Sequence, residues 1–402
     1  MTAETTAGPL ADLRVIEMGQ LLAGPFCGQL LGDFGAEVIK LEAPGVGDPM
    51  RQWGREQSQG KSLWWPVVAR NKKSVTCDLR NPEGQRLARE LIATADIVIE
   101  NFRPGTMERW GLGYEQLREI NPGLIMVRVT GYGQTGPYAP RAGYGSIGEA
   151  MGGIRYTTGD PDHAPARTGI SLGDSLAAVF ATIGTLAAVH HKERTGQGQL
   201  VDSAIYEAVL AMMESLLPEY AVTGYQRERT GSVLPNVAPS NVYPTAGGEM
   251  VLIAANQDTV FTRLTELMGR PELASDERYS THTARGARMD ELDELIAAWT
   301  ADADAEELLE TLHKAGVPAG RIYTARDMFN DPHFAARQAI VRVTHPELGE
   351  LPMQNVVPKL SATPGSVRHA GPDLGEHNAE VYGQVLGLDA DQIAKLAQTG
   401  VI

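Results

Sequence analysis

Strand-like and helix-like segments alternate through the first 130 residues of this chain. Apolar runs predict four strands, at residues 13–18, 36–41, 95–99 and 124–129. Helix-like segments separate the strands, and one of them begins with Asn81, a capping side chain followed by proline. Such alternation is typical of a parallel sheet covered by helices, so we predict an α/β fold with a Rossmann-like domain.

The length and composition indicate a globular protein of two domains, or of one domain with a large appendage. The chain has 402 residues, of which 43% are hydrophobic and 21% are charged. No run is expected to span a bilayer, and residues 1–8 lack the features of a signal peptide. Cys27 and Cys77 are too few for a disulfide framework or a metal cluster. We therefore expect a cytoplasmic protein with no membrane partner and no metal.

The charge balance argues against nucleic acid as a partner. The formal net charge is -15, from 35 basic and 50 acidic residues. Basic residues nevertheless gather at 70–73 and at Arg80, Arg103 and Arg109. This local concentration allows a site for a phosphorylated small molecule.

Three turns follow predicted strands, at residues 19–24, 101–105 and 131–136. Ligands of parallel sheets bind at the carboxyl ends of the strands, where these turns lie. Residues 131–136 have the spacing of a dinucleotide fingerprint, but Pro137 and Pro140 follow where that fingerprint requires a helix. A nicotinamide or flavin enzyme is therefore disfavoured.

Asp174 follows Gly173 at the start of a long apolar segment, residues 176–191, that predicts a helix. An aspartate there is commonly a helix N-cap. An ionised carboxylate at a helix N-terminus can also act as a nucleophile that forms a covalent acyl intermediate. Because Gly173 has no side chain, we expect a bulky reacting group to approach Asp174 closely.

The second half of the chain predicts a smaller α+β domain. Proline-rich residues 223–240 read as a linker, and residues 241–330 as the small domain. Gly247 and Gly248 separate two strand-like runs and predict a hairpin turn. A further hairpin is expected at 340–354, before a largely helical tail.

Eight short motifs occur in order along the chain and resemble the class III CoA-transferases, the formyl-CoA transferase and carnitine CoA-transferase group (CaiB/BaiF type). They are AGP (23–25), GAEVIKLE (35–42), GVGD (45–48), NKKS (71–74), ENFRPG (100–105), GYGQTGP (131–137), LGD (172–174) and TGQGQ (195–199). The resemblance runs from residue 10 to residue 402.

The resemblance implies an interlocked homodimer. Each chain is then expected to have a large domain at 1–222, completed by a C-terminal return at 331–402, beside the small domain. The family's catalytic aspartate falls on Asp174. The implied activity moves CoA from an acyl-CoA to a carboxylic acid through an aspartyl-CoA thioester. Backbone N–H groups at the helix start, including that of Ser175, are candidates to stabilise the oxyanion.

The resemblance also implies which residues contact CoA. These are Asp78, Leu79, Arg80, Asn101, Phe102, Arg103, Arg109, Arg141 and Tyr144. Family members often carry a basic residue after the glutamate equivalent to Glu42, but here Ala43 stands in its place. Lys72, Lys73 or Arg51 could supply the missing charge.

Two other functions remain open at this point. An α-methylacyl-CoA racemase shares the fold, but Tyr144 stands where its histidine base is expected, and a phenol is a poor base near neutral pH. A CoA-binding protein without catalysis would need Asp174 to be replaced.

The sequence says less about which carboxylic acid accepts CoA. The small domain has only two adjacent glycines where oxalate-specific members carry a glycine-rich loop, which disfavours oxalate. Segments 141–144 and 213–220 look more like members that use succinate-like diacids. Arg155 and Arg167 could then bind a distal carboxylate.

Overall fold

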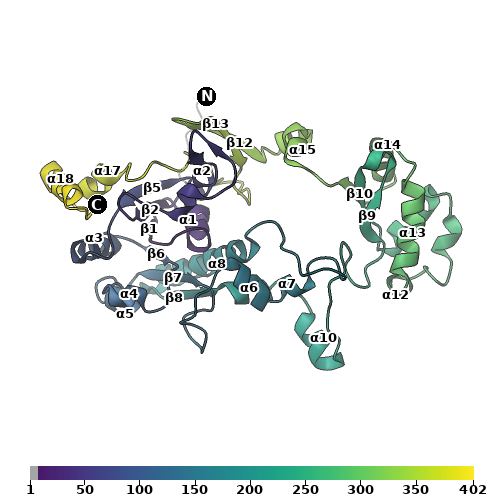
Figure 1. The fold of residues 1–402 in the computed structure, drawn as a ribbon, viewed down its shortest axis with the longest axis horizontal. Helices are drawn as coiled ribbons and strands as arrows, with labels where there is room; N and C mark the ends of the chain where they lie inside the picture. The colour runs from purple at the N-terminus through teal and green to yellow at the C-terminus, as the bar shows by residue number, and fades with distance from the viewer. Residues whose placement is uncertain (1–7) are drawn as a thin grey trace. The chain divides into compact units, whose positions relative to one another are not determined.

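The computed structural model describes residues 8–402 and divides them into two compact units (Figure 1). The first unit comprises residues 8–155, 168–218 and 333–402, and the second comprises 156–167 and 219–332. Residues 156–167 thus belong to the second unit, although the sequence placed them in the large domain. Residues 1–7, where no signal peptide was expected, lie outside the described residues.

The first unit is built on a six-stranded parallel sheet with the order β5-β2-β1-β6-β7-β8. Its strands are β1 (Arg14–Glu17), β2 (Glu37–Glu42), β5 (Lys72–Thr76), β6 (Ile97–Glu100), β7 (Ile125–Thr130) and β8 (Leu200–Ala204). The four strands predicted from apolar runs are confirmed. Along the chain this is the Rossmann order 3-2-1-4-5-6, whose direction reverses between β1 and β6. A ligand crevice is therefore expected at the carboxyl ends of these two strands.

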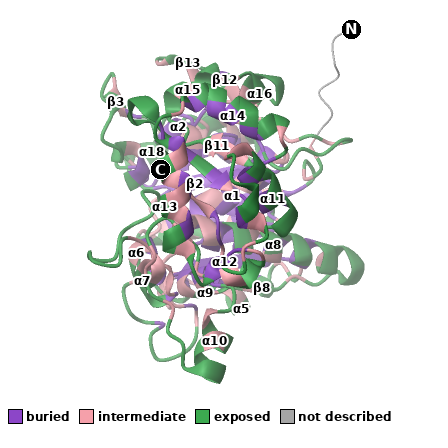
Figure 2. Ribbon diagram, turned by 90° about the vertical axis from the view of Figure 1, so that its right-hand side faces the viewer, coloured by how far each residue is buried: buried purple, intermediate pink, exposed green. Residues whose placement is uncertain are grey.

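Helices cover both faces of the sheet. On one face α1 (Ala23–Asp33) and α8 (Leu172–Thr195) pack on side chains such as Val15 and Ile97. Nearly all of α1 is buried, as the purple ribbon in Figure 2 shows. On the other face α3 (Pro82–Ala93) and the C-terminal helices pack on alternate residues such as Ile16. Both faces of the strands are buried, which explains their almost continuous apolar runs.

Helix α8 packs through small residues. Ala177, Ala181 and Ala188 are buried against the sheet face that α1 also covers. By length and composition alone α8 could cross a membrane, so the expectation that no run would qualify is wrong. The same test is passed by core helices of globular proteins, and α8 is one of the helices that cover the sheet.

The C-terminal tail closes the sheet edge at β5. Its helices are α17 (Asn378–Gln384) and α18 (Ala390–Gln398). The Tyr382 hydroxyl donates to the Thr76 carbonyl oxygen at 2.7 Å, and the Asp78 N–H donates to the Val401 carbonyl at 2.8 Å. The end of the chain is thereby fixed beside the loop that follows β5.

Shorter elements complete the first unit and its boundaries. They are the 3-10 turn Pro49–Gln52, β3 (Gln57–Ser58), β4 (Lys61–Ser62), α2 (Trp65–Val68), α4 (Thr106–Arg109), α5 (Tyr114–Arg118), α6 (Gly145–Met151), α7 (Ile154–Thr157), α9 (Ile205–Leu210), α10 (Leu216–Thr223), α16 (Pro332–Ala336), β12 (Ile340–His345) and β13 (Gly349–Gln354). The hairpin predicted at 340–354 is confirmed as the antiparallel pair of β12 and β13.

The second unit has an antiparallel sheet in the order β11-β10-β9, with helices packed on it. Its elements are β9 (Ser240–Pro244), β10 (Met250–Ala254), α11 (Asp258–Leu267), α12 (His282–Gly286), α13 (Met289–Thr300), α14 (Ala305–Lys314), β11 (Ala319–Arg321) and α15 (Ala325–Asn330), with 3-10 turns at Ala246–Gly248 and Pro271–Ala274. Gly247 and Gly248 both have φ of +84° and form the predicted turn between β9 and β10.

Candidate active site

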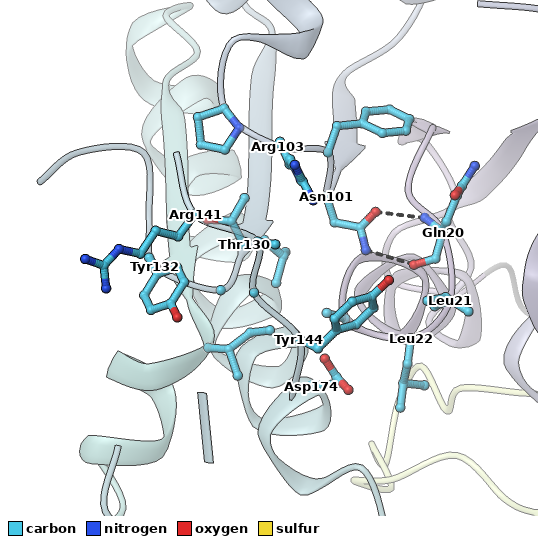
Figure 3. Close-up of a pocket in the computed structure, with 18 of the residues that line it drawn as sticks. Gln20, Leu21, Leu22, Asn101, Arg103, Thr130, Tyr132, Arg141, Tyr144 and Asp174 are labelled. Carbon is cyan, nitrogen blue, oxygen red and sulfur yellow. Dashed lines mark hydrogen bonds between the residues drawn. The ribbon is translucent and has the colours of Figure 1, made fainter. Parts of the chain in front are cut away.

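A cavity of about 220 Å³ lies at the carboxyl ends of β1, β6 and β7 (Figure 3). It occupies the switch point of the sheet, where the strand order reverses. The loop after β1 and the turn after β6 form one side, and the loops at 129–132 and 139–144 form the other. Its lining includes Gln20, Leu22, Trp53, Asn101, Arg103, Thr130, Tyr132, Arg141, Tyr144 and Asp174.

Hydrogen bonds hold the loop after β1 in place. The Gln20 N–H donates to Asn101 Oδ1, and Asn101 Nδ2 donates to the Gln20 carbonyl, both at 2.8 Å (Figure 3). Leu21 has φ of +63°, which is unfavourable for a residue with a side chain, and its N–H donates to Asp48 Oδ1 at 3.0 Å. The loop is therefore fixed by partners on two other segments.

A buried ion network lies beneath this loop. Lys40 Nζ is 2.8 Å from Asp48 Oδ2, 2.9 Å from Glu17 Oε1 and 2.8 Å from the Gly19 carbonyl oxygen. Burial disfavours the charged form of Lys40, but Asp48 and Glu17 more than offset this and raise its pKa. The charges compensate one another, as buried charges must.

Lys72 belongs to this network rather than to a phosphate site. Its Nζ lies 2.7 Å from Glu17 Oε2 and donates to the Pro25 carbonyl at 2.6 Å. Burial lowers the pKa of Lys72, because the residue is only 1% exposed. The prediction that Lys72 contacts CoA is therefore wrong.

Asp174 is the third residue of α8, and its half-buried side chain lines the cavity. The helix begins four residues earlier than predicted and its N-cap is Ser171, so the N-cap interpretation of Asp174 is wrong. In Figure 3 the Tyr144 ring lies next to the Asp174 carboxylate. Asp174 thus meets the geometric requirement for a residue that contacts a bound reactant.

Two glycines allow α6 and α8 to approach each other around Asp174. An ideal Cβ on Gly145 would lie 2.3 Å from Asp174 Oδ2, and one on Gly173 would lie 2.9 Å from the Gly145 carbonyl oxygen. The space beside Gly173 is therefore filled by helix α6. The expectation that Gly173 leaves space for a reacting group is wrong. Gly145 is the residue whose missing side chain leaves room for the carboxylate.

Two N–H groups at the start of α8 are already engaged. The Ser175 N–H donates to the Ser171 carbonyl at 3.1 Å, and the Gly173 N–H donates to Glu149 Oε1 at 3.2 Å. The prediction that the Ser175 N–H stabilises an oxyanion is therefore wrong, because the helix itself uses that donor.

Glu100 supports the turn after β6. Its Oε2 accepts a hydrogen bond from the Phe102 N–H at 2.7 Å, and its Oε1 lies 3.2 Å from Arg128 Nε. Burial raises the pKa of Glu100 to about 7, against the opposing effects of Arg128 and the Phe102 N–H. Glu100 thus links the backbone of this turn to Arg128 of β7.

A second cavity of about 630 Å³ adjoins the first, since Gln20 and Phe102 line both. It lies beyond β2 and β5, and the predicted residues Asp78, Leu79 and Arg80 line it. Ala43 and Pro44 contribute to the same wall. Among the described residues that line this cavity, Arg80 carries the positive charge.

The structure brings most of the predicted contact residues to these two cavities. Asn101, Phe102, Arg103, Arg141 and Tyr144 line the first cavity together with Asp174. Arg141 extends away from Asp174 in Figure 3, and its guanidinium stacks on Tyr138 at 3.7 Å.

Four other predicted cations lie outside the cavity linings. Lys73 Nζ pairs with Glu37 at 2.6 Å and with Glu380 at 2.8 Å. Arg109 is exposed and donates to the Thr106 hydroxyl. Arg51 makes a two-point contact with Glu42, with both N···O distances at 2.8 Å, and so is already engaged.

Arg155, the fourth of these cations, and Arg167 were predicted to bind a distal carboxylate of the acid. Arg155 Nη2 lies 2.9 Å from Glu149 Oε2, so it neutralises a protein carboxylate. Arg167 belongs to the second unit, and its role stays a prediction.

The sequence did not predict Leu22, Trp53 or Glu149 as site residues. Leu22 and Trp53 line the first cavity, and Glu149 bonds the amide that precedes Asp174. Neither apolar side chain carries a chemical signal, and Glu149 resembles any helical glutamate. Among residues 8–402, no group of three or more His, Cys, Asp or Glu side chains is placed to hold a metal ion.

Comparisons with known proteins identify relatives over the whole chain. The sequence matches the family described as CoA-transferase family III over residues 10–378. It is 62% identical to the succinyl-CoA--D-citramalate CoA-transferase of Chloroflexus aurantiacus, over 100% of both chains. It is 38% identical to the succinate--glutarate CoA-transferase of Agrobacterium fabrum, over 94% of this chain and 96% of that relative. Because these relatives are named CoA-transferases, the racemase alternative is not favoured.

Solved structures agree with this assignment. A CAIB/BAIF family protein from Brucella suis is 37% identical and has a TM-score of 0.84, covering 94% of this chain and 100% of that one. The protein Rv3272 from Mycobacterium tuberculosis is 31% identical with a TM-score of 0.81, covering 93% and 99%. These similarities confirm the α/β fold with a parallel central sheet.

The contact between Gly145 and Asp174 gives a first prediction. In Gly145→Ala the added methyl group displaces the carboxylate, so we expect kcat to fall about 100-fold, as for a reacting group misplaced by 1 Å. Steady-state kinetics and circular dichroism test this. The control is Gly320→Ala, where the new Cβ meets nothing within 4 Å. Wild-type turnover in a folded Gly145→Ala protein would contradict the assigned geometry.

Proposed function

The chain belongs to CoA-transferase family III and is a CoA-transferase. We propose that it moves CoA from succinyl-CoA to a small dicarboxylate through covalent intermediates on Asp174. The observation that carries this proposal is the position of the Asp174 carboxylate. It lines the cavity at the switch point of the sheet, beside a larger cavity suited to the rest of CoA.

The first half-reaction consumes the donor. An Asp174 carboxylate oxygen attacks the thioester carbonyl carbon, and the tetrahedral oxyanion collapses as the C–S bond breaks. CoA leaves as its thiolate, and a mixed anhydride of Asp174 and the acyl group remains. The thiolate then attacks the aspartyl carbonyl carbon. The acid is released as its carboxylate, and one of its two oxygens is the former Asp174 oxygen. An aspartyl-CoA thioester remains on the protein.

The second half-reaction reverses these steps with the acceptor. The acceptor carboxylate attacks the aspartyl thioester and displaces the CoA thiolate, which gives a second anhydride. The thiolate then attacks the acyl carbon of the acceptor. The new acyl-CoA leaves, and the Asp174 carboxylate is regenerated. No external proton donor is needed, because every leaving group departs as a stable anion.

The second cavity is proposed to bind the nucleotide end of CoA. Its volume of about 630 Å³ exceeds that of the first cavity, and Arg80 at its wall can donate two parallel hydrogen bonds to a phosphate. The pantetheine arm would then pass Gln20 and Phe102, which line both cavities, and present the thioester to Asp174. Arg80 would thus supply the positive charge that other family members often carry at the position of Ala43.

The Arg80 assignment predicts weaker CoA binding without that side chain. In Arg80→Ala the KM for succinyl-CoA should rise roughly tenfold with kcat nearly unchanged, because a charge-assisted hydrogen bond distant from the reacting atoms is lost. Arg118→Ala, at an exposed arginine with a 52% exposed side chain, is the control. An unchanged KM in Arg80→Ala would remove Arg80 from the site.

The substrates are proposed from the relatives. The relative that is 62% identical acts, by its name, on succinyl-CoA and D-citramalate, a branched hydroxydicarboxylate. A chain of this similarity over its full length is proposed to use the same donor and an acceptor of the same class. Oxalate is not expected, since the small domain lacks a glycine-rich loop beyond Gly247 and Gly248.

We also propose that the enzyme is a homodimer. On the side of α8 away from the sheet, Val179, Phe180, Ile183 and Leu186 are exposed by 36 to 57%. Their spacing places them on one helix face, and a contiguous apolar face of this kind is typical of a protein interface. A second copy of the chain is the proposed partner, as the family resemblance implies.

The dimer proposal predicts the effect of one surface charge. Ile183 is 57% exposed, so Ile183→Lys should leave the folded chain intact but disrupt association, because a lysine at the centre of an apolar interface loses its hydration. Sedimentation velocity measures the oligomeric state, with Glu193→Lys as the control on the same helix. A wild-type monomer at micromolar concentration would refute the proposal.

The proposed nucleophile makes a direct prediction. Incubation with succinyl-CoA should add the mass of CoA less one water to the wild-type protein, and hydroxylamine should remove it. Asp174→Asn should show no such adduct and should lose at least about 1,000-fold in kcat. Asp391→Asn, at an exposed aspartate of α18, is the control. An adduct on Asp174→Asn would refute the role of Asp174.

The same assay tests the acceptor class. The wild-type adduct should disappear rapidly on addition of citramalate or malate, and slowly on addition of oxalate. Faster discharge by oxalate than by either hydroxydicarboxylate would contradict the proposed substrates.

A further inference from the structure

The first turn of helix α8 makes no hydrogen bond with the side chain of its N-cap residue, Ser171. The acceptor for a first-turn amide comes instead from helix α6, where Glu149 Oε1 accepts from the Gly173 N–H at 3.2 Å. Helix N-termini require such acceptors, and a carboxylate is especially favourable at the positive end of the helix dipole. The bond joins α6 directly to the residue before Asp174.

Glu149 is built into the protein interior. It is 1% exposed, and its second oxygen, Oε2, pairs with Arg155 Nη2 at 2.9 Å. A buried carboxylate is costly unless it is paired and hydrogen-bonded, and here each oxygen has one partner. Arg155 has a 26% exposed side chain and so carries the countercharge toward the surface.

The same short helix contacts Asp174 at a second point. Gly145, the first residue of α6, faces the Asp174 carboxylate, where an ideal Cβ would lie 2.3 Å from Oδ2. Gly148 in α6 and Gly152, the residue that follows α6, are equally close to α9: a Cβ on Gly148 would lie 2.4 Å from Ile205 Cγ2, and one on Gly152 2.6 Å from Val209 Cβ. Helix α6 thus packs closely against α9 as well as α8.

From these contacts we infer that Glu149 is a positioning residue for the transfer reaction. Its bond to the Gly173 N–H fixes the start of α8 against α6 and so holds the Asp174 carboxylate at the cavity. Arg155 supports this role because its ion pair with Oε2 holds the Glu149 side chain in place. The inference rests on the proposed function of Asp174 as the nucleophile. It also replaces the predicted role of Arg155 as a ligand for a substrate carboxylate.

Two substitutions at Glu149 separate the hydrogen bond from the charge. Glu149→Gln keeps an oxygen that can accept from Gly173 N–H, so kcat should stay within about threefold of wild type. Glu149→Leu has similar size but no acceptor, and kcat should fall roughly tenfold or more while the KM for succinyl-CoA changes less than about twofold. Glu193→Leu makes the same change at an exposed glutamate near the other end of α8 and is the control.

The decisive readout is the single-turnover rate of adduct formation on Asp174, followed by intact-protein mass spectrometry. In Glu149→Leu this rate should fall by the same factor as kcat, with a full final adduct amplitude. A merely structural role would lower the amplitude, which counts folded sites, and leave the rate per site unchanged. A wild-type rate in Glu149→Leu, or a Glu149→Gln protein as slow as Glu149→Leu, would overturn the inference.

Arg155→Leu keeps the test informative if Glu149→Leu does not fold. Because the Arg155 side chain is 26% exposed, we expect water to reach Glu149 Oε2 in its place and the protein to fold. Glu149 is then held less firmly, so kcat should fall at least about threefold with an unchanged KM. Unchanged kcat would overturn the inference. The outcomes also separate the two proposals: absence of an adduct in wild type refutes Asp174 as the nucleophile, whereas a wild-type adduct that forms equally fast in Glu149→Leu refutes only the positioning role.

Discussion

The active-site geometry depends most on the contacts that the Lys40 ammonium group makes. This group joins the end of β1, through Glu17, to the following loop, through the Gly19 carbonyl oxygen, and to Asp48. Asp48 in turn accepts from the N–H of Leu21, whose φ is +63°. Because a buried charge that loses one partner is strongly destabilising, these contacts hold the loop in a single arrangement. One wall of the cavity is therefore held in place by contacts within the protein.

The opposite wall is organised by close helix contacts instead of charge. Gly145 and Gly173 let α6 and α8 meet at Asp174, and Glu149 supplies the acceptor for the amide just before it. In the proposed mechanism this carboxylate attacks the carbonyl carbon of the donor, and its own carbonyl carbon is then attacked twice, so it benefits from a fixed position. The fold thus places a carboxylate with little freedom at the point where the sheet opens to ligand.

The sequence was sufficient to predict four strands of the sheet, the hairpin turn at Gly247 and the place of Asp174 near the start of a helix, because each has a local signal. Strands buried on both faces give apolar runs, and paired glycines give φ above zero. The failures have a common cause. Lys72 reads as a surface cation, and only the tertiary structure pairs it with Glu17. Gly173 likewise suggests space that α6 fills, and Glu149 acts across 24 residues of chain.

If Asp174 is the nucleophile, its carboxylate also carries oxygen from one acid to the other, and this exchange tests the proposed mechanism most directly. Each turnover should transfer one Asp174 oxygen to the released acid and replace it with one from the acceptor carboxylate. We would allow the enzyme to turn over with a carboxylate acceptor labelled with ¹⁸O, digest the protein, and measure the mass of the peptide that contains Asp174 by mass spectrometry. Incorporation of ¹⁸O into Asp174 is the predicted result. An unlabelled Asp174 peptide after many turnovers would contradict transfer through this carboxylate.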